Sequence, residues 1–140
     1  VFNGAPFVAK AVASVRAQRH GDVEILVVDD VAANRNMLKD MLSPLGFDVI
    51  LAEDGVDALV QVKDDRPHLI LMDVVMPGQN GFQVTRAITR DPRFADLPVI
   101  MCTSKNQETD RVWAMRQGAK DYVTKPVDAE LLMSKIRSLG

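Results

Sequence analysis

Five side chains able to bind cations or phosphoryl groups each stand at the end of a short apolar run: Asp29, Asp30, Asp73, Thr103 and Lys125. Apolar runs of this length, bounded by turn residues, are typical of strands buried on both faces of a parallel sheet. The carboxyl ends of such strands lie along one edge of the sheet, where ligands of open α/β folds bind. We therefore expect the five side chains to converge at one edge.

The three carboxylates define the chemistry of that edge. Two carboxylates about 4 Å apart repel by roughly 4 kcal/mol at an effective dielectric constant near 20. A bound cation, or protonation of one group, is needed to relieve this repulsion. Oxygen ligands without a nearby histidine or cysteine favour a hard cation, and Mg²⁺ is the natural candidate.

Each of these residues taken alone has a simpler interpretation. An aspartate after a strand is often the N-cap of the next helix, and Asp30 could cap a helix that begins near Ala32. The Thr103 hydroxyl could bond to the backbone, and Lys125 could be a solvated surface charge. In a chain this short, however, the placement of all five residues at one edge of the predicted sheet favours a functional site.

The elements that must position these residues alternate along the chain from Glu24 onward. We expect strands at 25–28, 47–52, 68–72, 98–102 and 119–124, and helices at about 32–44, after Asp54, from about Gly81, at about 107–117 and after Asp128. Five strand–helix units with short connections predict an α/β fold with a parallel sheet and right-handed crossovers.

Composition excludes several classes of function. The 140 residues suffice for one compact domain, and a net charge of −2 creates no positive field for nucleic acid or anionic membranes. The single cysteine, Cys102, excludes an internal disulfide and lies in an apolar run. No apolar stretch approaches the roughly 20 residues of a membrane span, so a cytoplasmic domain is expected.

The first 22 residues fall outside the strand–helix alternation. We interpret 1–22 as a leader or linker, in which 7–16 could be helical, and as neither a signal peptide nor an anchor. Residues 23–140 are then the folded domain.

The order and spacing of the site motifs resemble a known family. Asp29-Asp30, the stretch from Leu71 to Gly78 with Asn80-Gly81, Thr103-Ser104, and Lys125-Pro126 are similar to the receiver domain of two-component response regulators. The resemblance covers about 23–139. It implies a flavodoxin-like five-stranded parallel sheet of order 2-1-3-4-5 with helices on both faces, the order the family shares with its chemotaxis member.

The resemblance also implies a role for each site residue. Asp73 would be the phosphoacceptor, and Asp30, Asp73 and the backbone carbonyl of Val75 would bind Mg²⁺, for which Mn²⁺ could substitute. Asp29 would hold the ion through water. Lys125, the Thr103 hydroxyl and the Ser104 amide would contact the phosphoryl group, and a cis peptide would precede Pro126.

The same resemblance implies how phosphorylation of Asp73 would be signalled to other proteins. Thr103 would move toward the phosphate and Tyr122 would turn inward, so that a downstream protein binds the face formed by 107–117, 119–124 and the last helix. The phosphoryl donor would be a histidine kinase or a phosphotransfer domain. Trp113 could be a core residue or an exposed partner contact. Such a switch catalyses its own phosphorylation and dephosphorylation and turns over no independent substrate.

The two halves of the sequence resemble different branches of the family. The stretch 103–119 is similar to single-domain regulators of type IV pilus twitching motility, whereas 31–47 is more similar to receivers of hybrid sensor kinases. A pilus-motility switch, a module excised from a hybrid kinase or multidomain regulator, and a composite chain all stay open. So does a receiver fold that works without phosphorylation.

Two other classes fit less well. A haloacid-dehalogenase-type phosphatase needs an aspartate two residues after its nucleophile, where Val75 stands. A flavodoxin-type FMN binder needs a phosphate loop in place of Asp29-Asp30. DNA binding is not expected, because no basic recognition helix is present.

Overall fold

The computed structural model describes residues 23–76, 78, 80–103 and 108–139. The expected leader, 1–22, and Ser104 lie outside the described residues. The elements are β1 (Glu24–Val28), α2 (Ala32–Leu42), the short 3-10 helix η1 (Ser43–Leu45), β2 (Asp48–Ala52), α3 (Gly55–Asp65), β3 (Leu69–Asp73), α4 (Gly81–Arg90), β4 (Val99–Thr103), α5 (Glu108–Arg116), β5 (Asp121–Thr124) and α6 (Ala129–Ser138).

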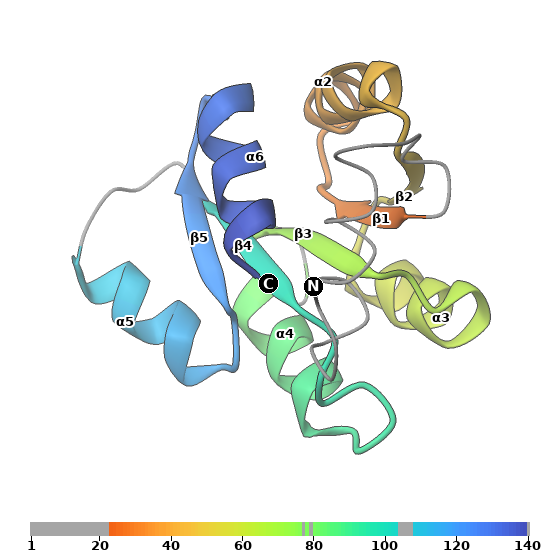
Figure 1. Cartoon of the computed structure of the whole chain (residues 1–140). Helices are drawn as coiled ribbons and strands as arrows, with labels where there is room; N and C mark the ends of the chain where they lie inside the picture. The colour runs from red at the N-terminus through yellow and green to blue at the C-terminus, as the bar shows by residue number, and fades with distance from the viewer. Residues whose placement is uncertain (1–22, 77, 79, 104–107, 140) are drawn as a thin grey trace.

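The five strands form one parallel sheet of order β2-β1-β3-β4-β5 (Figure 1). This is the predicted order. The alternation of strand and helix produces it, because a parallel neighbour can be reached only through a crossover, which the helices supply.

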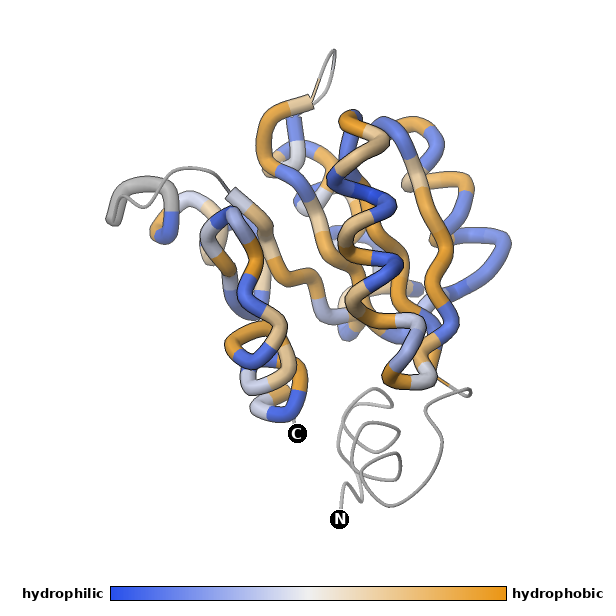
Figure 2. The backbone as a smooth tube through the Cα atoms, turned by 90° about the horizontal axis from the view of Figure 1, so that it is seen from above, coloured by the Kyte–Doolittle hydropathy of each residue, from blue (hydrophilic) through white to orange (hydrophobic). Residues whose placement is uncertain are grey.

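Helices cover both faces of the sheet because successive side chains of a strand point to opposite sides. In β1, Ile25 and Val27 join the core beneath α2 and α6, whereas Leu26 and Val28 join the core beneath α3, α4 and α5. Figure 2 shows the apolar strands enclosed by helices whose polar and apolar residues alternate. Burying each large apolar side chain contributes roughly 1.5–3 kcal/mol, so this two-sided burial holds the strand ends in place.

The observed start of α2 corrects one interpretation from the sequence. α2 has Val31 at its N-cap and no side-chain cap, so Asp30 is not the capping residue that an aspartate after a strand often is. The Asp29 carboxylate instead accepts a hydrogen bond from the Val31 amide (2.9 Å). Asp54 and Asp128 do cap α3 and α6, as expected.

Small differences from the expected bounds have local causes. The fifth strand begins at Asp121 rather than 119, because the Ala119 amide still bonds back to the Ala114 carbonyl of α5 (3.2 Å). Gly118 ends that helix with a φ of +98°, a conformation that favours glycine. The expected cis peptide between Lys125 and Pro126 is present.

Within the described part of the chain, no helix is both long enough and apolar enough to span a bilayer.

Candidate functional site

The site lies where the direction of chain crossover reverses. β1 and β3 are neighbours in the sheet, while the connections from β1 to β2 and from β3 to β4 lead outward in opposite directions. Ligands of doubly wound folds bind outside the carboxyl ends of the strands at this switch point. Val28 is level with Met72 in the register, so Asp29 and Asp73 leave their strands side by side.

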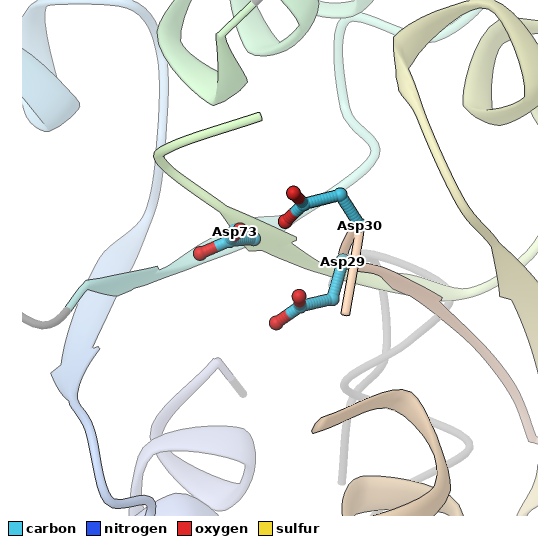
Figure 3. Close-up of side chains that lie close together, drawn as sticks. All are labelled: Asp29, Asp30 and Asp73. Atoms are coloured by element: carbon cyan, nitrogen blue, oxygen red, sulfur yellow. The ribbon is translucent and has the colours of Figure 1, made fainter. Parts of the chain in front are cut away.

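Three carboxylates meet there, as predicted. One oxygen from each of Asp29, Asp30 and Asp73 lies within 4.8 Å of the others (Figure 3). Asp29 and Asp73 are buried, at 1% and 5% exposed, whereas Asp30 is exposed. The cluster therefore has a protected inner side and one side open to solvent.

Lys125 reaches this cluster from β5, at the far edge of the sheet. Its ammonium Nζ donates to Asp29 Oδ2 at 2.9 Å and to Asp73 Oδ1 at 2.7 Å. Burial alone would lower the pKa of Lys125, but the hydrogen bonds to Asp73 and Asp29 outweigh that effect and raise its pKa. The lysine is thus held charged against the acidic pair.

The surroundings of Asp73 shift the pKa of its carboxyl group. Burial raises its pKa from the usual value; the hydrogen bond from Lys125 opposes this, and the charges of Asp29 and Asp30 add to it. Crowding and burial together make the ionised Asp73 costly unless positive charge stands beside it. Perturbed carboxylates of this kind are common at functional sites and differ from solvated surface acids.

The donor set suits a hard divalent cation. The described residues around the cluster offer carboxylate oxygens, and Mg²⁺ binds through one or two carboxylates while keeping several waters. The exposed side at Asp30 leaves room for such waters. The cluster fits Mg²⁺ on these grounds.

The remaining predicted residues fall around this centre. Thr103 is the buried last residue of β4, and its carbonyl accepts the Lys125 amide at 2.7 Å, which joins the two strand ends. Val75 stands on the loop after β3 with its side chain 65% exposed. Tyr122 is half-buried in β5, with the Lys135 ammonium 5.6 Å from its ring centre.

Two residues near the site carried no role in the sequence-based prediction. Arg35, in the first turn of α2, donates from Nη1 to the Asp29 carbonyl at 2.7 Å and so braces the loop that holds the acidic pair. Gly81 opens α4 so close to β3 that a Cβ there would overlap the Asp73 carbonyl oxygen and lie 3.0 Å from the Val74 Cα. Asn80-Gly81 belongs to the motifs that resemble the receiver family, but the sequence alone shows no sign of this close contact.

Comparisons with known proteins agree with this geometry. Residues 25–137 match the response regulator receiver domain model. The chain is 48% identical over 115 residues to protein PilH of Pseudomonas aeruginosa, covering 82% of this chain and 95% of PilH. It is 41% identical over 115 residues to the response regulator PleD of Caulobacter vibrioides, covering 82% of this chain but only 25% of PleD.

Solved structures show the same fold. The chemotaxis protein CheY4 of Vibrio cholerae superposes with a TM-score of 0.80 at 27% identity, over 84% of this chain and 98% of CheY4. Receiver domains are two-component signalling switches that interact with histidine kinases or phosphotransfer proteins and with downstream effectors, and they are not in general metabolic enzymes. With the matched family model, the sheet order and the acidic strand ends in agreement, this chain belongs to the response regulator receiver domain family.

Proposed function

We propose that this protein accepts a phosphoryl group on Asp73 from a histidine kinase or phosphotransfer domain, with Mg²⁺ bound beside it. The observation that carries the proposal is the buried Asp73 carboxylate held against Lys125, within 4.8 Å of the oxygens of Asp29 and Asp30. This arrangement combines a nucleophilic oxygen, a cation-binding group and a fixed positive charge.

The metal ligands are proposed from the resemblance to receiver domains, and the clustering of Asp29, Asp30 and Asp73 supports them. Asp30, Asp73 and the Val75 carbonyl are assigned to Mg²⁺, or to Mn²⁺ in its place, and Asp29 holds the ion through water. When bound, the ion neutralises the carboxylates and the charge spread over the phosphoryl oxygens. Asp30 is exposed, so its carboxylate is open to an ion that arrives from solvent.

The chemical step is a transfer between two protein side chains. A carboxylate oxygen of Asp73 attacks phosphorus, the phosphorus–nitrogen bond of the phosphohistidine breaks, and the imidazole leaves and takes up a proton. Lys125 then pairs with a phosphoryl oxygen as a point charge. Thr103 and the Ser104 amide donate hydrogen bonds to the other phosphoryl oxygens.

The signal is assigned to the face formed by α5, β5 and α6. Transfer adds charge and acceptor oxygens at the end of β3. Thr103 moves toward them, and the half-buried Tyr122 turns inward behind it. A downstream protein then distinguishes the two states at this face.

The pathway proposal rests on relatives. The match to 95% of PilH supports a switch in type IV pilus motility, in which 23–140 is the receiver unit working in the cytoplasm. The alternative is a receiver taken from a hybrid kinase or multidomain regulator. The 25% coverage of PleD supports it, because the same domain also occurs as a small part of longer proteins.

Intact-mass measurement after incubation with acetyl phosphate and Mg²⁺ tests the phosphoacceptor. We expect a gain of one phosphoryl group that disappears in Asp73→Asn and in the presence of a chelator. The control is Asp40→Asn, which removes an exposed acid of α2 and leaves phosphorylation intact. A protein that gains no mass, or an adduct that persists in Asp73→Asn, overturns the proposal.

A further inference from the structure

A groove between α4 and α5 carries positive charge that the phosphorylation site does not use. Four exposed cationic side chains line it: Arg86, Arg90, Arg116 and Lys120. The chain as a whole has a net charge of −2, so the groove is a local exception to the charge of the molecule. Its lining residues include no aspartate or glutamate.

These cations are not neutralised by the fold. Among the residues that the structure describes, none of the four forms an ion pair with a carboxylate, whereas Lys125 and Lys135 both do. Like charges gathered in one groove repel one another, and their fields add toward any ligand that enters. An anionic ligand would relieve the repulsion.

The groove continues into a less polar hollow. Arg86 and Gln117 line both parts, and Phe82 and Trp113 contribute aromatic surface to the second part. Trp113 is 51% exposed, which resolves the choice between core residue and surface contact in favour of the surface. The Arg116 guanidinium lies 5.9 Å from the Trp113 ring centre and so connects the cationic and aromatic parts.

Contacts between its walls fix the shape of the groove. The Thr89 hydroxyl of α4 donates to the Gln117 carbonyl beyond the end of α5 at 2.8 Å. A side chain at Gly118 would collide with the Thr89 side chain, so the two walls are closely packed at this end. A preformed groove binds with a smaller entropic cost than one that must be ordered by its ligand.

The chemistry favours a carboxylate-bearing chain over a small phosphate compound. Arginine guanidinium groups match carboxylates and phosphates alike. However, the Gly118 and Lys120 amides already donate to Met115 and Val99 carbonyls, so no backbone cradle for phosphate is left at this end. The groove is also an open channel rather than the enclosed cavity typical of small-molecule sites.

We propose that the α4–α5 groove docks an acidic peptide segment of a partner protein. Its carboxylates would pair with Arg86, Arg90, Arg116 and Lys120, and an aromatic or aliphatic side chain would pack on Phe82 and Trp113. This surface lies between α4 and α5, and its lining residues include none from β5 or α6. The proposal does not depend on phosphorylation of Asp73.

Trp113 is the single tryptophan of the chain, so its fluorescence reports directly on the groove. The probe is a synthetic peptide of alternating glutamate and phenylalanine, free of tryptophan and titrated in Mg²⁺-free buffer. We expect a saturable change in Trp113 emission and an affinity that falls severalfold as salt is raised, because exposed charges are screened. A matching lysine–phenylalanine peptide should not bind.

The variant Arg86→Glu/Arg90→Glu should weaken the acidic peptide at least tenfold. The control variant Lys39→Glu/Arg137→Glu makes the same change in net charge on exposed positions of α2 and α6, and should bind as the wild type does. Equal binding by both variants, or by both peptides, overturns the proposal. Tighter binding of inorganic tripolyphosphate, lost in the groove variant, would also overturn it and assign the groove to phosphate.

Discussion

Gly81 determines how closely α4 can approach the acidic cluster. Any side chain there meets the Asp73 carbonyl oxygen, which is backbone and cannot rotate away. Gly78 offers a comparison, because it has a φ of +79° but open space around its Cα. The two glycines lie near each other in sequence and are required for different reasons: one for contact, the other for backbone conformation.

Gly81→Ala is therefore expected to lower the free energy of unfolding by about 3 kcal/mol, the upper part of the usual range for an overpacked site. Gly78→Ala should cost only about 1 kcal/mol, the penalty of a left-handed non-glycine residue. Urea unfolding of both variants measures the difference. Equal losses would show that the close approach of α4 to β3 is not needed.

Cys102 is a free thiol buried in the sheet. It lies in β4, 2% exposed, and burial raises the pKa of its thiol to about 12. The native protein should therefore resist an aromatic disulfide reagent at pH 8 and react at once in urea. Because the folded pKa lies above the ordinary value of 9.0, the thiol's contribution to stability is complete below pH 9 and is lost as pH rises toward 12.

Cys102→Ala has no thiol to ionise, so it should lose less stability than the wild type as the pH rises from 9 toward 12. Rapid labelling of the native wild-type protein at pH 8 would contradict the burial of the thiol.

At the scale of elements, α4 is fixed by a reciprocal cap at its first turn. The Asn80 side chain accepts from the Gln83 amide at 3.0 Å, and the Gln83 side chain accepts from the Asn80 amide at 2.9 Å. This capping box satisfies two donors that the helix itself leaves unpaired. It places the start of α4 beside the end of the loop that follows Asp73.

Asn80→Ala should lower the free energy of unfolding by about 1 kcal/mol, because the Gln83 amide loses its acceptor. Asn36→Ala is the matched control, since Asn36 is an exposed residue in the middle of α2 and alanine is the better helix former there. Denaturant midpoints with unchanged slopes are the measurement. A loss of the same size in both variants would show that the cap adds nothing.

The buried strands could be predicted from the sequence. The way in which helices pack on other elements could not. The run Leu69–Asp73 is buried at every position, and its uninterrupted apolar pattern predicted a central strand ending at Asp73. The consecutive apolar residues 112–115 of α5 gave no periodicity from which to choose an inward side. Only Ala114 of the four is buried, and Trp113 faces solvent.

The candidate site shows the same division. Convergence of the acidic residues and Lys125 followed from topology, since parallel strands end at one edge. The contacts of Arg35 and Gly81 depend on how α2 and α4 pack back onto the strand ends, which a pattern within one element does not encode. The Asp30 cap was a local interpretation that failed because Val31, one residue later, is the N-cap of α2.

At the scale of the whole molecule, one lysine joins strands that are far apart in sequence. Lys125, directly after β5, pairs with Asp29 after β1 and with Asp73 at the end of β3, across separations of 96 and 52 residues. β4 lies between β3 and β5 in the sheet, so the lysine side chain spans the end of β4. Formation of this ion pair network requires that β1, β3, β4 and β5 be assembled in the sheet.

Replacement of Lys125 by methionine keeps most of the side chain's apolar stem and removes its charge. Asp29 and Asp73 are 2% and 7% exposed at their side chains, so they would be left buried and uncompensated. In Mg²⁺-free buffer, Lys125→Met should lower the free energy of unfolding by about 3–5 kcal/mol, the usual cost of removing one partner of a buried pair. Lys120→Met, at an exposed lysine without a carboxylate partner in the described part of the chain, should change it little.

Mg²⁺ should then stabilise Lys125→Met more than the wild type, because in the wild type the ammonium already neutralises the two buried carboxylates. A ligand that binds only the folded state adds about 2.7 kcal/mol at a concentration one hundred times its Kd. Thermal unfolding at increasing Mg²⁺ concentrations measures this gain in stability. Asp30→Asn should reduce the gain both in the wild type and in Lys125→Met. A Mg²⁺ effect that is equal in the wild type and Lys125→Met would mean that the ion and the lysine do not share the same carboxylates.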